Sequence, residues 1–239
     1  MLNNITDEAS AELIQFYRQQ LEAGVKGSGE YEAHLSLGLL YWRDNGGEGN
    51  DSTNYHLTEG ARCAADLYQK RKDNRDTRGN NLFEFMIPLF IVLIAGDEKS
   101  RRVMAGIDRV YWASEQPAEF ESMILFFDLL RRHLIKVHYP DVEVNEVLAA
   151  NNTPETHPFY KPWIEMFCTG VLAVNAGENG RVAFACQSLV ELHRKEALTG
   201  DWQLRVEGLL SFWASGLLKI ANSSGINIDA AENYLYRFN

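Results

Sequence analysis

The sequence predicts an all-α protein, a multi-helix bundle of antiparallel helical hairpins that forms a single domain over residues 1–239. Two stretches, 82–112 and 163–194, carry this prediction, because in each a long apolar run leads through a glycine-containing turn into an amphipathic segment. In these turns Gly96 and Gly177 are expected to end the first helix in a left-handed conformation, since glycine has no Cβ to disfavour it. No stretch alternates with a period of two residues between turn signals, so strands are not expected.

The remaining helices follow from apolar residues at helical spacing and from capping residues. Thr6 or Asp7 suits the N-terminus of the first helix, and Asn81 with Glu84 forms a capping pair before the first apolar run. Pro88 lies about two turns into that run, so its helix is either kinked there or begins later. In chain order, these further helices are expected over residues 5–23, 31–42, 55–72, 118–137, 142–149 and 204–221.

Two segments interrupt the helices. Residues 43–54, RDNGGEGNDSTN, are polar and glycine-containing and are expected to form an exposed, mobile loop. Residues 138–162 contain four of the six prolines and are expected to be mostly a connection. If this connection divides the molecule, the halves 1–137 and 158–239 would form a quasi-repeat of about eighty residues; otherwise, adjacent helices in any bundle converge on similar turns.

Composition and length favour a folded protein with a real core, since 46% of the 239 residues are hydrophobic. The longest apolar run, 85–95, contains Pro88 and is far shorter than the roughly 20 residues that cross a bilayer. The N-terminus MLNNITDEAS has neither the basic nor the apolar region of a signal, so we expect a cytoplasmic protein without a membrane partner. Cys63, Cys168 and Cys186 stand among apolar residues and are expected to be buried, reduced thiols rather than disulfides or zinc ligands.

The charge is acidic and unevenly distributed. The net charge is −10 at pH 7, and residues 1–60 carry ten acids against three bases. A second acidic stretch, without a base, contains Glu115, Glu119, Glu121 and Asp128. Such a field repels nucleic acid and lipid headgroups and attracts basic protein surfaces, so we expect a basic protein partner and no nucleic-acid partner. For any single acidic residue, ordinary solubility is the competing explanation.

Catalytic chemistry is not indicated. The sequence has no Gly-x-Ser-x-Gly elbow, no His-Glu-x-x-His pair, no phosphate-binding glycine loop and no dinucleotide fingerprint. His34 follows Glu30 by four residues and Glu59 follows His56 by three, spacings that would suit metal or acid-base chemistry. Two such pairs are expected by chance, so we expect no catalytic residue, no metal and no cofactor. Variants at these four positions should leave any turnover at background.

The C-terminal region carries a resemblance to a known class of proteins. Residues 204–221, LRVEGLLSFWASGLLKIA, are rich in small residues that permit close helix packing, and an aromatic end follows at 234–238. Together with the Ala-Gly-Asp turn of the first hairpin and the segment LHRK at 192–195, this pattern resembles the all-helical immunity proteins of bacterial polymorphic toxin systems. The resemblance covers about residues 82–238, and Tyr236 stands roughly where such proteins usually have a proline.

The resemblance implies an antidote that binds a co-encoded toxin, often a nuclease, and blocks it without doing chemistry. A toxin that acts on nucleic acid must be basic around its active site, so an acidic helical surface can occupy that channel with fast, salt-sensitive association. Charge reversal at Asp44, Glu48 and Asp51 together is expected to slow this association. From charge and expected exposure, the partner-binding residues are Glu30, Glu32, Asp44, Glu48, Asp51, Glu59, Glu115, Glu119 and Glu121.

An alternative interpretation is a scaffold that binds a peptide. Leu37-Gly38-x-x-Tyr41 is similar to part of a tetratricopeptide unit, in which a small residue lets another helix approach closely. With the helical hairpins, it would form a concave groove for a short linear ligand rather than for a folded toxin domain. An enzyme is the third interpretation, since a fold class alone leaves function open.

Overall fold

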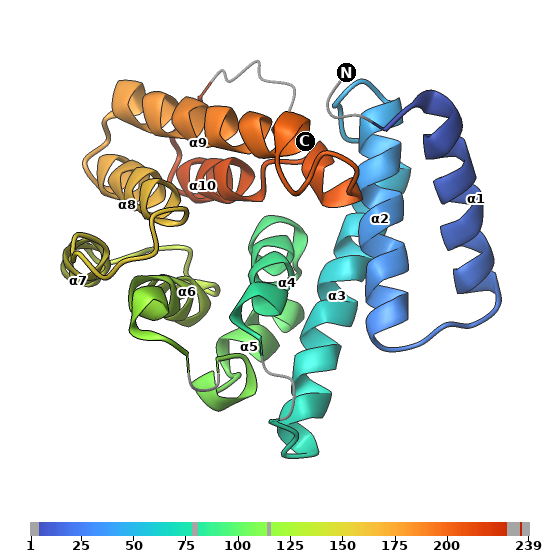
Figure 1. The fold of residues 1–239 in the computed structure, drawn as a ribbon, viewed down its shortest axis with the longest axis horizontal. Helices are drawn as coiled ribbons and strands as arrows, with labels where there is room; N and C mark the ends of the chain where they lie inside the picture. The colour runs from blue at the N-terminus through green and yellow to red at the C-terminus, as the bar shows by residue number, and fades with distance from the viewer. Residues whose placement is uncertain (1–4, 78–80, 114–115, 229–234, 236–239) are drawn as a thin grey trace.

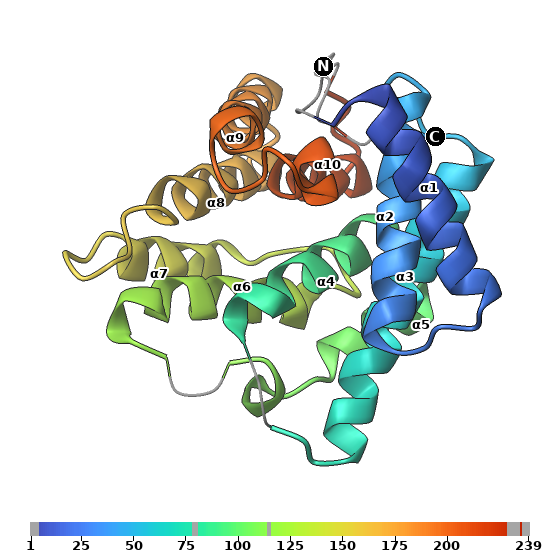
Figure 2. The same ribbon diagram turned by 45° about the vertical axis from the view of Figure 1, so that its right-hand side comes forward.

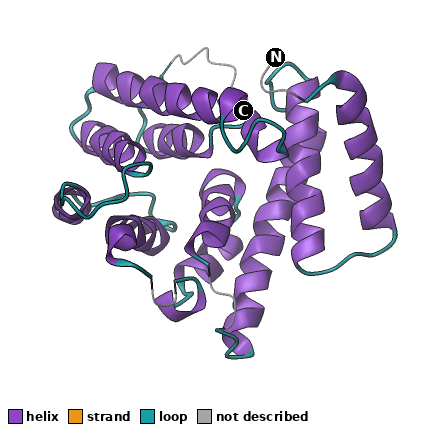
Figure 3. Cartoon of the chain, in the orientation of Figure 1, coloured by secondary structure: helices purple, strands orange, loops and turns teal. Residues whose placement is uncertain are grey.

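The computed structural model describes residues 5–77, 81–113, 116–228 and 235, and every regular element within them is helical (Figure 3). The all-α prediction is therefore confirmed. The α-helices of the described residues are α1 (Asp7–Glu22), α2 (Ser28–Asp44), α3 (Asp51–Asp73), α4 (Leu82–Ala95), α5 (Glu98–Ala105), α6 (Glu121–His133), α7 (Asp141–Asn151), α8 (Lys161–Asn175), α9 (Asn179–Thr199) and α10 (Phe212–Ser223). Short 3₁₀ turns occur at η1 (Arg109–Tyr111), η2 (Ala118–Phe120) and η3 (Val206–Leu209).

The helices form two groups that meet at α4. On one flank α1, α2 and α3 stand side by side, and α4 lies next to α3 near the centre of the molecule (Figure 1). On the other side α8, α9 and α10 pack on one another, with α6 and α7 below them in the same view. A turn of 45° shows α4 between α10 and α6 (Figure 2). One cluster of buried apolar side chains extends through both groups, from Ile5 to Leu235.

Trp213 lies at the centre of the core. Its ring is stacked on Phe126 of α6 at a centroid distance of 4.8 Å, and it also meets Phe90 of α4 and Trp163 of α8 at 5.1 and 5.7 Å. Ser211 starts the helix that carries it, because the Ser211 hydroxyl accepts a backbone N–H from the first turn of α10. Side chains from four helices therefore meet at one indole, which is 2% exposed.

Glycine closes the seam between α2 and α3. A Cβ on Gly38 would lie 2.5 Å from Cδ2 of Leu57, and a Cβ on Gly60 would lie 3.4 Å from the backbone nitrogen of Leu35. Leu57 is fully buried, so a shift of its side chain would have to displace packed neighbours. The interpretation of Gly38 as a small residue that admits a neighbouring helix is confirmed.

Gly38→Ala is expected to lower the free energy of unfolding by about 1–3 kcal/mol, because its methyl group would overlap the buried Leu57 side chain. Gly180→Ala provides the same substitution in the first turn of α9, where nothing lies within 4 Å of the new Cβ. That control is expected to be unchanged or to stabilise the protein by about 0.5–1 kcal/mol. Urea unfolding of the two variants measures the difference, and a Gly38 variant as stable as the Gly180 variant would contradict the packing.

Side-chain caps fix the starts of several helices as predicted. Thr6 is the N-cap of α1, since its hydroxyl accepts the N–H of Ala9 at 3.2 Å. Asn81 caps α4. Its predicted partner Glu84 lies 3.9 Å from an arginine of α3 instead. The helix begins at Leu82 and continues through Pro88, so the suggestion of a later start is wrong.

The loop predicted over 43–54 is shorter than expected. Helix α2 continues through Asp44, and α3 already begins at Asp51. The reason is Asn50, whose side chain accepts the N–H of Thr53 at 2.8 Å and so starts a helix inside the polar segment. Residues 45–50 alone connect α2 to α3.

Three predicted helices are shorter than expected. The amphipathic helix expected in the second half of the stretch 82–112 ends at Ala105, because Gly106 stops it and the chain continues as η1. The helix expected over 118–137 divides into η2 and α6 and ends at His133. The last helix, expected from residue 204, begins only at Phe212, after η3 and the Ser211 cap. In the sequence, the helical spacing of apolar residues continues past these helix ends, but local caps and turns end the helices.

The two hairpin turns differ in backbone conformation. Gly177 has φ of +70°, as predicted for a left-handed residue after α8. The same prediction is wrong for Gly96, which is extended with φ of −66° and ψ of 139°. The chain extends there because Asp97 follows as the N-cap of α5, accepting the N–H of Ser100 at 2.6 Å. The second helices of the hairpins differ as well, with 8 residues in α5 and 21 in α9.

The proline-rich segment contains a packed helix. The helix predicted over 142–149 is confirmed as α7, which packs against both α6 and α8. Its last residue, Asn151, is buried and donates from its side chain to the carbonyl of Lys161 at 2.9 Å. Val144 and Val147 belong to the same core cluster as the rest of the chain.

The cysteines are buried, free thiols, as predicted. Burial raises the pKa of Cys63 to about 11 and that of Cys186 to about 12, and it raises the pKa of Cys168 further. The thiols are therefore protonated at neutral pH. Among the described residues, no helix has the length and apolar character needed to cross a bilayer.

Candidate binding groove

Two adjoining cavities form a groove between the ends of α2, α3 and α4 and the segment that links α9 to α10. The central compartment has a volume of about 460 Å³ and the aromatic compartment about 210 Å³; they share Phe83, Ile87 and Arg205. The central compartment is lined by Ser28, Tyr31, Glu32, Leu35, Ser36, Leu67, Tyr68, Arg71, Phe83, Glu84, Ile87, Pro88, Arg205 and Glu207. The aromatic compartment is lined by Phe83, Met86, Ile87, Phe159, Tyr160, Glu196, Asp201, Trp202 and Arg205.

Charged groups of both signs meet in the central compartment. The guanidinium of Arg71, from the last turns of α3, lies 5.1 Å from the centre of the Tyr68 ring and 3.9 Å from the Glu84 carboxylate. Pro88, one turn after Glu84, has no N–H to donate to the Glu84 carbonyl. This side of α4 therefore presents a carboxylate and a backbone acceptor together.

Two buried polar atoms of the central compartment have no hydrogen-bond partner within the described residues. They are the hydroxyl of Tyr31 and Nη1 of Arg71. Burial raises the pKa of Tyr31 well above its ordinary value, and the nearby Tyr68, Glu207 and Glu32 raise it further, so the hydroxyl keeps its proton. An unpaired buried donor costs about 1–3 kcal/mol, so a small shift of either side chain toward an acceptor on a ligand would be favourable.

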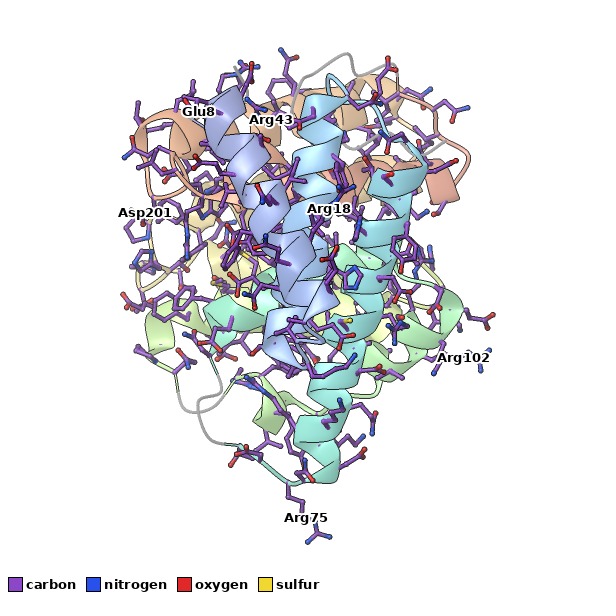
Figure 4. All side chains as sticks on the ribbon, turned by 90° about the vertical axis from the view of Figure 1, so that its right-hand side faces the viewer. Glu8, Arg18, Arg43, Arg75, Arg102 and Asp201 are labelled. Atoms are coloured by element: carbon purple, nitrogen blue, oxygen red, sulfur yellow. The ribbon has the colours of Figure 1, made fainter. Side chains whose placement is uncertain are left out.

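The aromatic compartment gathers rings from three parts of the chain. Phe83 lies in the first turn of α4, Phe159 and Tyr160 precede α8, and Trp202 follows α9. The ring centres of Phe83 and Phe159 lie 5.7 and 4.8 Å from that of Tyr160. Burial first, and then the carboxylates of Asp201 and Glu196, raise the pKa of Tyr160 to about 12. The compartment therefore combines aromatic walls with two carboxylates, of which Asp201 projects at the edge of the molecule in Figure 4.

The segment 200–208 is held in place by close packing and by one buried histidine. A Cβ on Gly208 would collide with the carbonyl oxygen of Trp202, so only glycine fits there. The ring of Trp202 lies between Trp163 and His193, at centroid distances of 6.0 and 5.1 Å. His193 Nε2 lies 2.9 Å from the Gly208 carbonyl and donates to it, since a carbonyl can only accept. This histidine belongs to the LHRK segment singled out in the sequence.

His193 is expected to make the stability of the protein pH-dependent. Burial lowers its pKa to about 4, below the ordinary value of 6.5, so the unfolded chain takes up the proton first. Stability is therefore complete above about pH 6.5 and is lost as the pH falls toward 4, by roughly 2 kcal/mol at pH 5 for this group. Urea unfolding at pH 7 and pH 5 measures the loss. In His193→Gln, which keeps an N–H donor but does not titrate, the loss should be smaller, and an unchanged loss would contradict the assignment.

The structure disperses the eight predicted partner-binding residues that it describes. Glu32 alone lines the groove. Glu119 and Glu121 are exposed beside Phe120, whose ring centre is 5.3 Å from that of Phe83 in the groove. Glu115 lies outside the described residues.

Asp44, Glu48 and Asp51 gather at the turn between α2 and α3, toward the end of α2 opposite to Glu32, and all three are exposed. The Asp44 carboxylate accepts a hydrogen bond from Nη1 of Arg43 at 2.7 Å, which holds it in place. The same Arg43 bonds to the start of α1, and Figure 4 shows it beside the N-terminal end of that helix. We call Asp44, Glu48 and Asp51 the turn carboxylates.

Glu30 and Glu59 lie along the α2–α3 seam near a pair of histidines. The Glu30 carboxylate lies 3.1 Å from the ammonium of Lys26, and the Glu59 carboxylate lies 2.5 Å from the guanidinium of Arg62. Each carboxylate is therefore paired with a base three or four residues away in the sequence. The Nδ1 atoms of His34 and His56 are 3.0 Å apart, and burial lowers the pKa of both, that of His56 to about 4. At neutral pH these are two uncharged rings that share one hydrogen bond. Within the described residues, no three His, Cys, Asp or Glu side chains are grouped to hold a metal ion.

The sequence interpretation missed four of the five acids in the groove. Glu84 belongs to the predicted capping pair, Glu196 and Asp201 fall beyond the predicted hairpin 163–194, and Glu207 falls in the first turn of the helix predicted over 204–221. Arg71 stands between Lys70 and Lys72 in the last turn of α3, where positive charges complement the helix dipole. The signal for this groove in the sequence is the pair Asp201 and Trp202, an acid beside an aromatic residue in a connecting segment.

No family model, curated protein or solved structure matches this chain. The groove, its charges and the arrangement of the helices therefore carry the functional argument. The resemblance of residues 82–238 to immunity proteins enters that argument only as a proposal.

Proposed function

We propose that this protein is an immunity protein that binds a co-encoded basic toxin through the groove and blocks the toxin's active site. The observation that carries the proposal is the charge of the groove, which has five carboxylates against two guanidinium groups. The carboxylates are those of Glu32, Glu84, Glu196, Asp201 and Glu207, and the guanidinium groups are those of Arg71 and Arg205. A basic protein segment is the complementary ligand.

The apolar lining supports a protein partner rather than a small cation. Phe83, Phe159, Tyr160 and Trp202 form an aromatic patch in the same groove as the five carboxylates. Aromatic residues at the core and polar residues at the rim are the ordinary anatomy of a protein interface, and aromatic side chains carry much of the binding energy. The net charge of −10 would steer a basic toxin toward the protein and speed association.

The alternative, a tetratricopeptide-like scaffold for a peptide, is favoured by the glycine-closed seam of α2 and α3. The remaining helices do not repeat that unit, since α4 and α8 run across the direction of α1 to α3 instead of stacking beside them (Figure 2). A scaffold would bind a short linear segment of its partner, whereas the proposed antidote binds a folded toxin domain.

Co-expression with the product of the neighbouring gene tests the proposal. The neighbour is produced in an inactivated form for co-purification and calorimetric titration, and in its active form for growth assays. We expect a tight one-to-one complex and restored growth of cells that express the active neighbour. A complex without rescue of growth would reject the antidote function, and binding to an unfolded segment alone would favour the peptide scaffold. Absence of any complex would reject the proposed partner.

A further inference from the structure

We infer that the aromatic compartment is the recognition pocket for one arginine side chain of the partner. The inference deepens the proposed function and rests on it for the identity of the partner, but not for the chemistry of the pocket. Three features of the compartment carry it: aromatic faces, two carboxylates in the lining, and a volume of about 210 Å³, suited to one long side chain.

The walls are rings that would pack against a flat cation. Phe159 and Tyr160 meet edge to face at 4.8 Å, and Phe83 lies 5.7 Å from Tyr160. Phe159 and Phe83 are 39% and 37% exposed, so part of each ring is open to a ligand. Guanidinium groups stack on aromatic faces, and this attraction strengthens when water is excluded.

The carboxylates come from the end of α9 and the segment after it. Glu196 and Asp201 line the same compartment as Tyr160, and their charges raise the pKa of its hydroxyl. Gly200 leaves room for the Glu196 carboxylate, since a Cβ at that position would overlap it. The backbone N–H of Trp202 donates to the Glu196 carbonyl at 3.3 Å, which ties the backbone of Trp202 to the end of α9.

Arginine fits this arrangement better than lysine or an apolar side chain. Its planar group can stack on a ring while its N–H groups bond to two carboxylates, whereas an ammonium offers no flat face. An apolar side chain would exclude water from Glu196 and Asp201 without adding a second cation. Arg205 of the chain itself lines the compartment, so two carboxylates face one resident guanidinium and the pocket keeps one negative charge in excess.

The test uses the full-length protein without the toxin. Nα-acetyl-arginine amide is titrated while NMR follows the indole N–H signals of the five tryptophans. A Trp202→Phe variant assigns the Trp202 signal. We expect a saturable shift of that signal, and about tenfold weaker binding of the citrulline analogue, which has the same shape without the charge. Equal binding of the two probes, or no shift of the Trp202 signal, would overturn the inference.

Paired variants show whether the two carboxylates are responsible. Glu196→Gln with Asp201→Asn should weaken binding of the arginine probe about tenfold or more. Glu165→Gln with Glu191→Gln makes the same change of net charge on the exposed faces of α8 and α9 and should leave binding unchanged. An equal loss in both pairs would overturn the inference in favour of a general charge effect. If the neighbouring protein binds and the probe does not, the inference fails while the proposed function stands; the reverse outcome rejects the proposed function alone.

Discussion

Neutralising three carboxylates of the groove, in the variant Glu32→Gln, Glu84→Gln and Asp201→Asn, is expected to weaken binding of the proposed toxin partner about 100-fold. Each lost contact with a basic side chain removes on the order of 1 kcal/mol, and three together remove about 2.7 kcal/mol. All three side chains are exposed, so the substitutions should leave the fold intact. Surface plasmon resonance would show the loss mainly as faster dissociation, because these groups lie within the proposed contact.

The turn carboxylates provide the matched control. Asp44→Asn, Glu48→Gln and Asp51→Asn change the net charge from −10 to −7, as the groove variant does. We expect this control to slow association modestly at low salt, through weaker long-range attraction, and to leave dissociation unchanged. If the turn variant dissociated faster and the groove variant dissociated at the unaltered rate, the contact surface would lie at the α2–α3 turn instead.

Trp213→Ala is expected to lower the free energy of unfolding by about 3–5 kcal/mol. The indole is 2% exposed and packs against rings from α4, α6 and α8, so its loss leaves a cavity where these helices meet α10. For a chain of this size the midpoint of thermal unfolding should fall on the order of 10 °C. Calorimetry or urea unfolding measures the change.

Phe184→Ala is the control for that loss. Phe184 lies on α9 and is 65% exposed, so its truncation should change stability by less than about 0.5 kcal/mol. If both variants lost stability equally, the centre of the core would have to lie elsewhere. Trp213→Phe should fall between the two, since a smaller ring keeps part of the stacking on Phe126.

Helix positions could be predicted from the sequence wherever packing and capping agreed. In α1 and α4, apolar spacing and the caps Thr6 and Asn81 point to the same start, and the structure confirms both. At Gly96 the pattern expected for a helix end and the next cap disagreed. Asp97 is the N-cap of the following helix, and the glycine before it is extended rather than left-handed. Periodicity alone also carried the last helix back to residue 204, although Ser211 starts it seven residues later.

The groove could not be assembled from the sequence, since its acids come from four separate segments. Glu32 belongs to α2, Glu84 to α4 and Glu196 to α9, and Glu207 belongs to η3, which packs against α2 (Figure 1). Charge density along the chain pointed instead to the turn carboxylates, which are close in sequence but lie away from the groove. The packing of α2, α3 and α4 and the tertiary contacts of the segment 200–208 bring the groove acids together.

Hydrogen exchange of the complex with the inactivated neighbour tests the central claim most directly. If the groove is the contact surface, amides in residues 82–88 and 196–208 should be protected on binding, while those of the α2–α3 turn should exchange as in the free protein. Protection confined to residues 44–51, with unchanged exchange in the groove segments, would contradict the account.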